Sequence, residues 1–173
     1  KPAFRKPIRS KRCLVVADAF IEGTTKEQLD KPFLVHLEKD RRPFAFAGLW
    51  DEWIDKSSGE VVHSFAIITT TPTALLQKLP HHRSPVILQR NEEARWLNPN
   101  ADLMDITSLL SPYRGYMNAY PISAEIKNPR NNRRELIKPI GSAIHAESKM
   151  KLEQDLVLEG MGFTRSRQRK GGA

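Results

Sequence analysis

The sequence has few of the cysteines and none of the long apolar runs that are typical of secreted and membrane proteins. It contains one cysteine, Cys13, among 173 residues, so an internal disulfide is excluded and a reducing cytoplasm is the expected location. It has no apolar run of about eighteen residues, which excludes a membrane-spanning helix. Its first residues do not combine a basic start, an apolar middle and a small-residue cleavage site, so we expect no secretory signal in them.

Motifs for metals, phosphates and serine nucleophiles are also missing. The chain has no CxxC or HExxH spacing, and the adjacent His81 and His82 are poorly placed to share one ion. Neither a Walker loop nor a dinucleotide-binding glycine motif occurs, and there is no GxSxG elbow. We therefore expect no metal ion and no organic cofactor.

Positive charge is what the sequence has in excess. It carries 28 Lys and Arg against 20 Asp and Glu, a net charge of +8. Residues 1–12 contain six basic side chains interleaved with Phe4 and Ile8, and a second cluster occupies residues 130–134. Cations neutralise phosphates and aromatic rings stack on unpaired bases, so this pattern favours a nucleic-acid partner. A merely solvated basic surface is the alternative.

The apolar periodicity predicts one α+β domain in which short polar turns join the early strands into an antiparallel meander. The expected strands are 13–20, 32–39, 44–55, 61–70, 84–90 and 117–123, and the expected helices are 71–80, 91–98 and 105–113. The predicted helix N-caps are Thr71 or Thr73, then Asn91, then Asp105 or Thr107. A shift in composition predicts a core domain over residues 1–140 and an extension over 141–173 that ends in a basic, flexible tail.

Two short stretches contain candidate acid/base groups. Asp18 and Glu22 follow an apolar run, and a half-buried carboxylate there can exchange protons near neutral pH, although a solvated strand end is the alternative. His81 and His82 are adjacent, so on an extended chain they point in opposite directions and at most one faces a given cleft. Arg83 can hold a phosphate through two hydrogen bonds.

Seven blocks, read in order from Lys1 to about Ile140, resemble the SRAP family (SOS response-associated peptidase domains). The blocks are "KPAFRKPIRSKRCLVVADAFIEG", "FAGLWDEW", "FAIITTTPT", "HHRSPVIL", "WLN", "YPIS" and "NNRRELIKPI". The ordered series is far more specific than any one block.

The resemblance implies a fold and an activity. The fold is a mixed α+β domain around a curved, barrel-like, mostly antiparallel sheet with short peripheral helices. The implied partner is single-stranded DNA carrying an abasic site. An N-terminal cysteine attacks the ring-opened sugar, and its amine and thiol close a thiazolidine that crosslinks the protein to the lesion. Family members act as monomers, and the implied location is cytoplasmic and nucleoid-associated.

The resemblance also implies roles for individual residues. Glu22 matches the family's proton-transferring glutamate, although Ala19 and Gly23 stand where the family typically has glycine and tryptophan. His81 matches the catalytic histidine, and His82 is an alternative because the spacing here is about one residue longer than usual. The residues expected to contact DNA are Lys1, Phe4, Arg5, Thr69 and Arg83.

The family's nucleophile and its lesion-gripping asparagine–alanine–arginine segment both precede the position of Lys1. Cys13 falls within the first predicted strand, where a buried thiol is usually inert. We therefore expect the chain to represent the larger C-terminal part of an SRAP domain. Two alternatives remain open at this point. One is a non-catalytic module that binds single-stranded DNA, and the other is a peptidase that acts on its own N-terminus.

Overall fold

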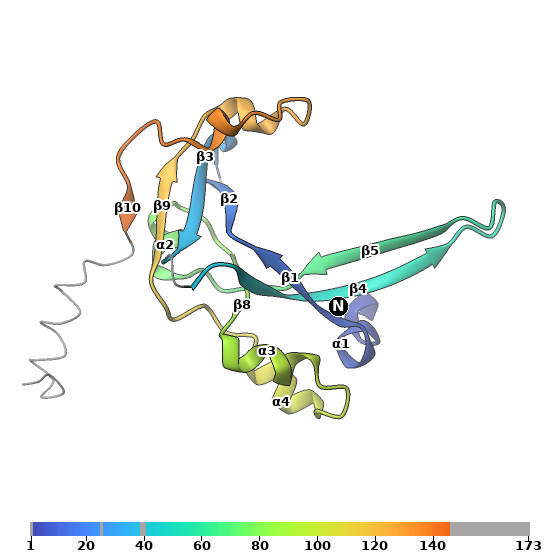
Figure 1. Ribbon diagram of the computed structural model, residues 1–173. Helices are drawn as coiled ribbons and strands as arrows, with labels where there is room; N and C mark the ends of the chain where they lie inside the picture. The colour runs from blue at the N-terminus through green and yellow to red at the C-terminus, as the bar shows by residue number, and fades with distance from the viewer. Residues whose placement is uncertain (1, 25, 39–40, 146–173) are drawn as a thin grey trace, which may run out of the picture.

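The computed structural model describes residues 2–24, 26–38 and 41–145. It has the predicted α+β architecture, with antiparallel strands and short helices at their periphery (Figure 1). The sheets formed by these residues do not close on themselves, so the predicted barrel-like curvature fits only loosely. Lys1 and the predicted tail lie outside the described residues.

Two four-stranded sheets make up most of the structure. The first has the order β1-β4-β5, with β8 also paired to β4, and the second has the order β10-β9-β3-β2. A separate two-stranded sheet pairs β6 with β7. The strand bounds are β1 Arg12–Ala17, β2 Ala19–Thr24, β3 Gln28–Leu37, β4 Phe44–Ile54, β5 Val61–Ile67, β6 Thr69–Thr70, β7 Ser84–Pro85, β8 Ile87–Leu88, β9 Met117–Pro121 and β10 Ile144–His145.

The first predicted strand, residues 13–20, is wrong as a single element. The chain bends at the exposed Asp18, so β1 joins the first sheet and β2 joins the second. Glu22 therefore lies within β2 rather than after the end of a strand. The predicted meander is also wrong, because β3 pairs with β2 and β9 while β4 pairs with β1 and β5.

The helices are short. Their bounds are η1 Pro2–Phe4, α1 Pro7–Ser10, α2 Ala74–Lys78, α3 Arg90–Leu97, α4 Leu103–Ser108, η3 Ala124–Lys127 and η4 Arg134–Ile137. Of these, α2, α3 and α4 overlap the three predicted helices. The Thr73 cap of α2 is confirmed. The other two predicted caps are wrong, because Gln89 forms a capping box with Glu92 and Asp102 accepts from the Asp105 N–H. Among the described helices, none is both long and apolar enough to cross a membrane.

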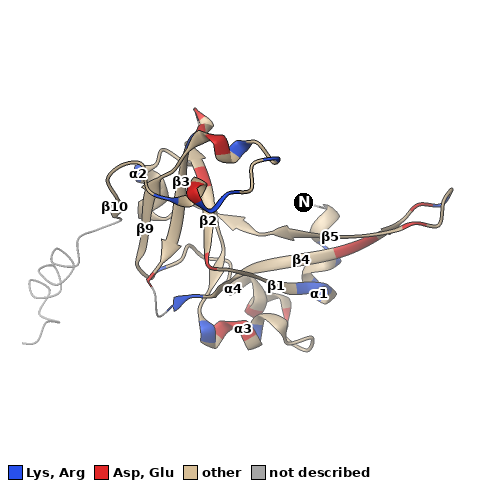
Figure 2. Ribbon diagram, turned by 45° about the horizontal axis from the view of Figure 1, so that its top comes forward, with Lys and Arg blue, Asp and Glu red and all other residues tan. Residues whose placement is uncertain are grey.

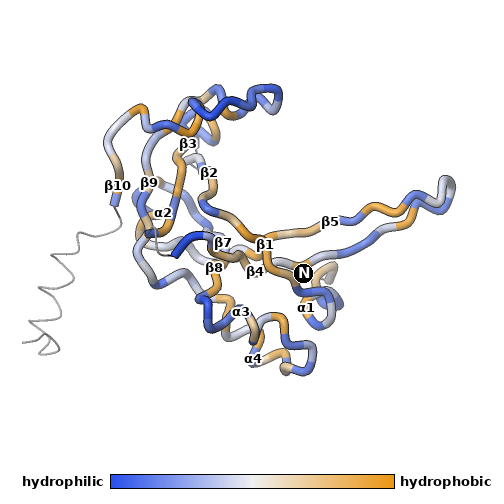
Figure 3. The backbone as a smooth tube through the Cα atoms, in the orientation of Figure 1, coloured by the Kyte–Doolittle hydropathy of each residue, from blue (hydrophilic) through white to orange (hydrophobic). Residues whose placement is uncertain are grey.

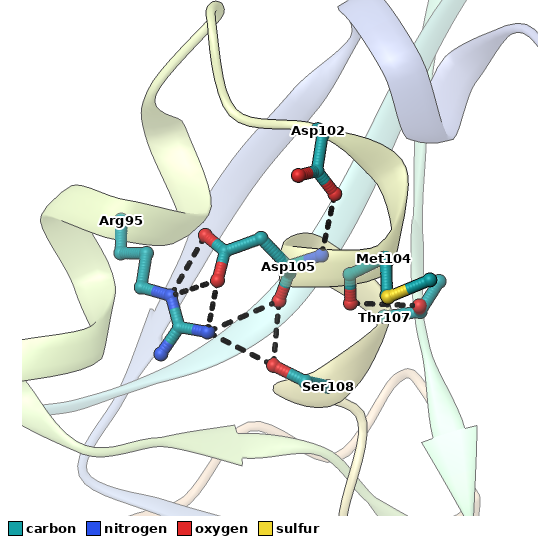
Figure 4. Close-up of polar contacts among 6 residues, drawn as sticks. All are labelled: Arg95, Asp102, Met104, Asp105, Thr107 and Ser108. Atoms are coloured by element: carbon teal, nitrogen blue, oxygen red, sulfur yellow. Dashed lines mark hydrogen bonds and ion pairs between the residues drawn. The ribbon is translucent and has the colours of Figure 1, made fainter.

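An ion pair fixes α3 against α4. The guanidinium of Arg95 reaches both carboxylate oxygens of Asp105 and the hydroxyl of Ser108 (Figure 4). Hydrogen bonds from Arg95 hold the pKa of Asp105 below its usual range. The two helices therefore form one unit below the first sheet.

Strand β4 separates two apolar cores. Because side chains alternate along a strand, Phe46 faces a core with Val35 and Leu75, while Ala47 faces a core with Trp96. Full burial of a large apolar side chain stabilises a fold by about 1.5–3 kcal/mol, so these clusters are the main stabilising contacts. The first six residues of β4 are buried, whereas the last five are exposed.

Candidate functional site

A carboxylate and an imidazole meet where strand β2 approaches the loop after α2. Oε1 of Glu22 lies 3.5 Å from Nε2 of His81. The same ring also contacts the carbonyl of Gly23, which lies 58 positions earlier in the chain. The two side chains are 25% and 19% exposed, so the pair is shielded but open to a ligand from one side. Sequence reasoning selected both residues, and the structure brings them together.

The imidazole is oriented by main-chain groups. The His81 N–H donates to the Leu76 carbonyl at 2.9 Å, which fixes this residue at the end of α2. Nδ1 of the ring lies 2.9 Å from the Gly23 carbonyl oxygen. A carbonyl can only accept, so Nδ1 carries the hydrogen of the neutral ring and Nε2 keeps its lone pair toward Glu22.

Gly23 makes this arrangement possible. The pairing of β2 with β3 shifts between Gly23 and Thr24, and this brings the Gln28 backbone against Gly23. A Cβ at position 23 would lie 2.1 Å from the Gln28 carbonyl oxygen, closer than any real contact. Sequence reasoning treated Gly23 only as a departure from the family pattern. A hydrogen bond made by a main-chain carbonyl cannot be predicted from the type of residue that carries it.

The surroundings of Glu22 favour its protonated form. Burial raises the pKa of the Glu22 carboxyl above its ordinary value, while the charge of His81, the Gly23 N–H and the charge of His82 oppose that rise. A carboxyl with a raised pKa can hold a proton closer to neutral pH and release it during a reaction. The pair is therefore suited to moving one proton onto a bound molecule and another off it.

His82 lies beside His81 rather than opposite to it. The two rings stack with centroids 5.3 Å apart and planes 21° apart, and both line a pocket of about 240 Å³ with Glu22. The prediction that at most one histidine faces a given cleft is wrong, because the chain is not extended there. His82 is nevertheless exposed, whereas His81 is half-buried and bonded to both Leu76 and Gly23.

Three of the predicted DNA-contacting residues share a second pocket. Phe4, Thr69 and Arg83 line a mostly apolar cavity of about 430 Å³, together with Ile8 and Leu110, which sequence reasoning did not select. The pairing of β6 with β7 brings these segments together, and Nη2 of Arg83 donates to the Thr69 carbonyl at 3.3 Å.

Of the two remaining candidates, Arg5 is exposed and does not line this cavity. Lys1 falls outside the described residues. The pocket around Glu22 has no lining residue in common with the one around Arg83. Only His82 lies between His81 and Arg83 in the chain, so the two pockets are lined by residues of the same loop.

Among the residues that it describes, the structure offers no metal site, and the one cysteine is poorly suited to act as a nucleophile. No three His, Cys, Asp or Glu side chains in that part of the chain gather closely enough to hold an ion. Cys13 lies in β1 opposite Gly48, and burial raises the pKa of its thiol, which disfavours the reactive thiolate.

Comparison with known proteins gives consistent matches. The family model "SOS response associated peptidase (SRAP)" matches residues 1–129. The chain is 43% identical over 141 residues to the abasic site processing protein YoqW of Bacillus subtilis, covering 80% of this chain and 62% of that protein. It is 28% identical over 169 residues to the abasic site processing protein HMCES of Xenopus tropicalis, covering 84% and 50%.

A crystal structure of a Bacteroides thetaiotaomicron protein has the same fold. It superposes with a TM-score of 0.72 at 34% identity, and the match covers 82% of this chain and 62% of that chain. The chain therefore spans less than two thirds of the length of these relatives.

Proposed function

Because the chain belongs to the SRAP family, we propose that it binds single-stranded DNA at abasic sites and supplies the acid/base groups for covalent capture of the lesion. The contact between Glu22 and His81 is the observation that carries this proposal. The nucleophile in this proposal is an N-terminal cysteine that the 173 residues do not contain.

The proposed chemistry joins an amine, a thiol and an aldehyde with the loss of one water. The cysteine amine adds to the aldehyde carbon of the open sugar, and the carbinolamine then loses its hydroxyl as water to give an imine. The thiol sulfur adds to the imine carbon, its proton passes to the nitrogen, and the ring closes as a thiazolidine. Protonated Glu22 supplies the proton for the departing hydroxyl, and Nε2 of His81 accepts a proton from the incoming nucleophile.

The second pocket holds the DNA in this proposal. Arg83 pairs with a phosphate, and Phe4 offers a ring for an unpaired base at the rim of the same cavity. Thr69 and Arg5 supply further polar contacts along the strand. The net charge of +8 favours such binding without regard to sequence, while the aldehyde itself provides selectivity for the lesion.

The test is a denaturing gel of the chain with single-stranded DNA carrying one abasic site. The chain is used alone and together with the N-terminal segment, meaning the part of the Bacillus relative that precedes its match to this chain. We expect a heat- and detergent-resistant band only when the N-terminal segment is present, and salt-sensitive binding in a native gel without it.

Each other outcome contradicts part of the proposal. A covalent band with the chain alone would place the nucleophile within these 173 residues. Binding without any covalent band in either mixture would favour a non-catalytic DNA-binding module. Removal of residues from the N-terminal segment without a DNA adduct would favour the self-peptidase alternative.

A further inference from the structure

Arg12 joins the ends of two helices that lie far apart in the sequence. Nη1 of its guanidinium donates to the carbonyls of Ile8 and Arg9 in α1, at 2.7 and 2.8 Å. Nε donates to the Trp96 carbonyl in the last turn of α3, and Nη2 donates to the Asn98 carbonyl just beyond it, both at 2.6 Å. The last carbonyls of a helix have no partner within that helix, so one side chain satisfies the C-terminal ends of both α1 and α3.

The shape of the Arg12 side chain explains why an arginine occupies this position. Arg12 is half-buried and is the charged first residue of β1, an otherwise hydrophobic strand (Figure 3). Its guanidinium carbon lies 5.9 Å from the centre of the Trp96 ring, which is fully buried and donates from Nε1 to the Cys13 carbonyl. The four hydrogen bonds to carbonyls engage all three guanidinium nitrogens. A planar fork of donors permits this arrangement, whereas a lysine ammonium does not.

Helix α1 is too short to keep its position without such contacts. It has four residues, and its N-cap makes no side-chain hydrogen bond. Isolated helices shorter than about twelve residues are marginal in water, and Figure 2 shows α1 as a basic segment whose like charges repel one another. Further contacts come from the Ile8 side chain against the core around Trp96 and from the Trp50 N–H on the Lys11 carbonyl. The place of α1 beside α3 therefore depends strongly on Arg12.

The segment that includes η1 and α1 forms one wall of the pocket around Arg83. Phe4 and Ile8 line that pocket together with Arg83, which belongs to the separate loop before β7. Within the first wall, Nη1 of Arg9 donates to the Arg5 carbonyl at 2.5 Å, which connects α1 to the chain that follows η1. Because the two walls come from different parts of the chain, a shift of α1 would change the width of the pocket.

We propose that Arg12 is a positioning residue for this pocket. By holding α1 against α3, it places Phe4 and Ile8 at the separation from Arg83 that a DNA strand requires. This inference rests on the proposed function, which makes the pocket the DNA-binding site. Arg12 acts in it through the main chain of α1 and not by pairing with a phosphate, since its guanidinium nitrogens are already bonded. The position of Phe4 can be measured without DNA, so the two proposals can be tested separately.

The first experiment measures binding of single-stranded DNA to the Arg12→Lys chain by fluorescence anisotropy. Lysine keeps the charge and loses the fork, so we expect the affinity to fall by about two- to tenfold, the equivalent of one lost hydrogen bond. The salt dependence of binding should not change, because no phosphate contact is lost. Arg95→Lys is the matched control, since it loosens α4 from α3 in the same manner. It should lower the midpoint of urea unfolding and leave the DNA affinity unchanged.

A double-mutant cycle distinguishes positioning from a general loss of stability. If Arg12 acts through Phe4, Phe4→Ala should lower the affinity much less in the Arg12→Lys chain than in the unaltered chain. Arg83→Ala should lower it by the same factor in both chains, because Arg83 lies on the other wall. A fluorine-labelled phenylalanine at Phe4 gives a reading without DNA. Its NMR signal should shift or broaden with Arg12→Lys and stay the same with Arg95→Lys.

Several results would overturn the proposal. They are an unchanged affinity in Arg12→Lys, an equal loss in Arg95→Lys, effects of Arg12→Lys and Phe4→Ala that simply multiply, and a fluorine signal that does not respond to Arg12→Lys. A fluorine signal that does respond, in a chain that binds no single-stranded DNA, would keep Arg12 as the residue that positions Phe4 and contradict the proposed function instead.

Discussion

The His81 ring donates through Nδ1 to the Gly23 carbonyl and presents Nε2 to the Glu22 carboxylate, so two consecutive residues of β2 determine both its orientation and its proton partner. Because both ring nitrogens have partners, the half-buried ring has a single orientation, and its neutral form has a single tautomer. The geometry therefore distinguishes His81 from its neighbour His82, which the sequence spacing had kept open as an alternative.

His81→Ala and His82→Ala should differ in the crosslinking reaction of the chain with the N-terminal segment. Loss of His81 removes the oriented proton acceptor, and we expect the rate to fall by about 10²–10⁴. His82→Ala should keep the rate within the same order of magnitude. The measurement is single-turnover adduct formation on a denaturing gel, and equal losses in both variants would contradict the assignment.

Glu22→Gln should stabilise the protein near neutral pH. Burial raises the folded-state pKa of Glu22, so its contribution to stability is fully present below its unfolded pKa and is lost as pH rises through the folded one. Glutamine has no such loss. Urea unfolding of both proteins should show the variant more stable at about pH 7 and the difference shrinking toward about pH 4. A variant that is less stable at neutral pH would mean that the contact with His81 outweighs burial.

Arg83→Ala should reduce the salt dependence of binding to single-stranded DNA. One lost phosphate contact lowers the slope of log K against log salt by about 0.7. Arg83→Lys keeps the charge and should keep most of the slope while losing the paired hydrogen bonds of the guanidinium. Fluorescence anisotropy over a salt series measures this, with Arg114→Ala, an exposed arginine that does not line the Arg83 pocket, as control. An unchanged slope in Arg83→Ala would remove this residue from the DNA interface.

Gly23→Ala should destabilise the fold and disturb His81 together. The added Cβ would meet the Gln28 carbonyl at 2.1 Å, and the forced shift should cost about 1–3 kcal/mol. It should also weaken the bond to Nδ1 and shift the NMR signals of the His81 ring. Gly59→Ala at the tip of the β4–β5 hairpin, where φ is +75°, is the control. It should destabilise the fold through its backbone conformation yet leave the NMR signals of the His81 ring as they were.

Local sequence signals predicted the secondary-structure elements well in segments where one hydrophobic period, that of a strand or that of a helix, dominates. The run that became β4 and the Thr73 cap of α2 follow from alternation and capping preference. The break at Asp18 could not be predicted in this way, because apolar residues continue on both sides of it. The pairing of β3 with β9 depends on residues eighty or more positions away.

The candidate site was predictable in its residue types and not in its geometry. The resemblance to the SRAP family selected Glu22 and His81, while residue patterns alone left both open to a solvated interpretation. Their contact depends on the register shift at Gly23 and on the backbone bond from His81 to Leu76, and neither involves a recognisable side-chain motif. The stacking of His82 on His81 likewise depends on the shape of the loop after α2.

The division of β4 between Leu49 and Trp50 separates a part of the strand that holds the fold together from a part that does not. The buried half contributes side chains to both cores, whereas the exposed half contributes to neither. An apolar-to-polar substitution in the buried half therefore carries the cost of burying a polar group, while the same substitution in the exposed half carries almost none. One strand thus tolerates sequence change very differently along its length.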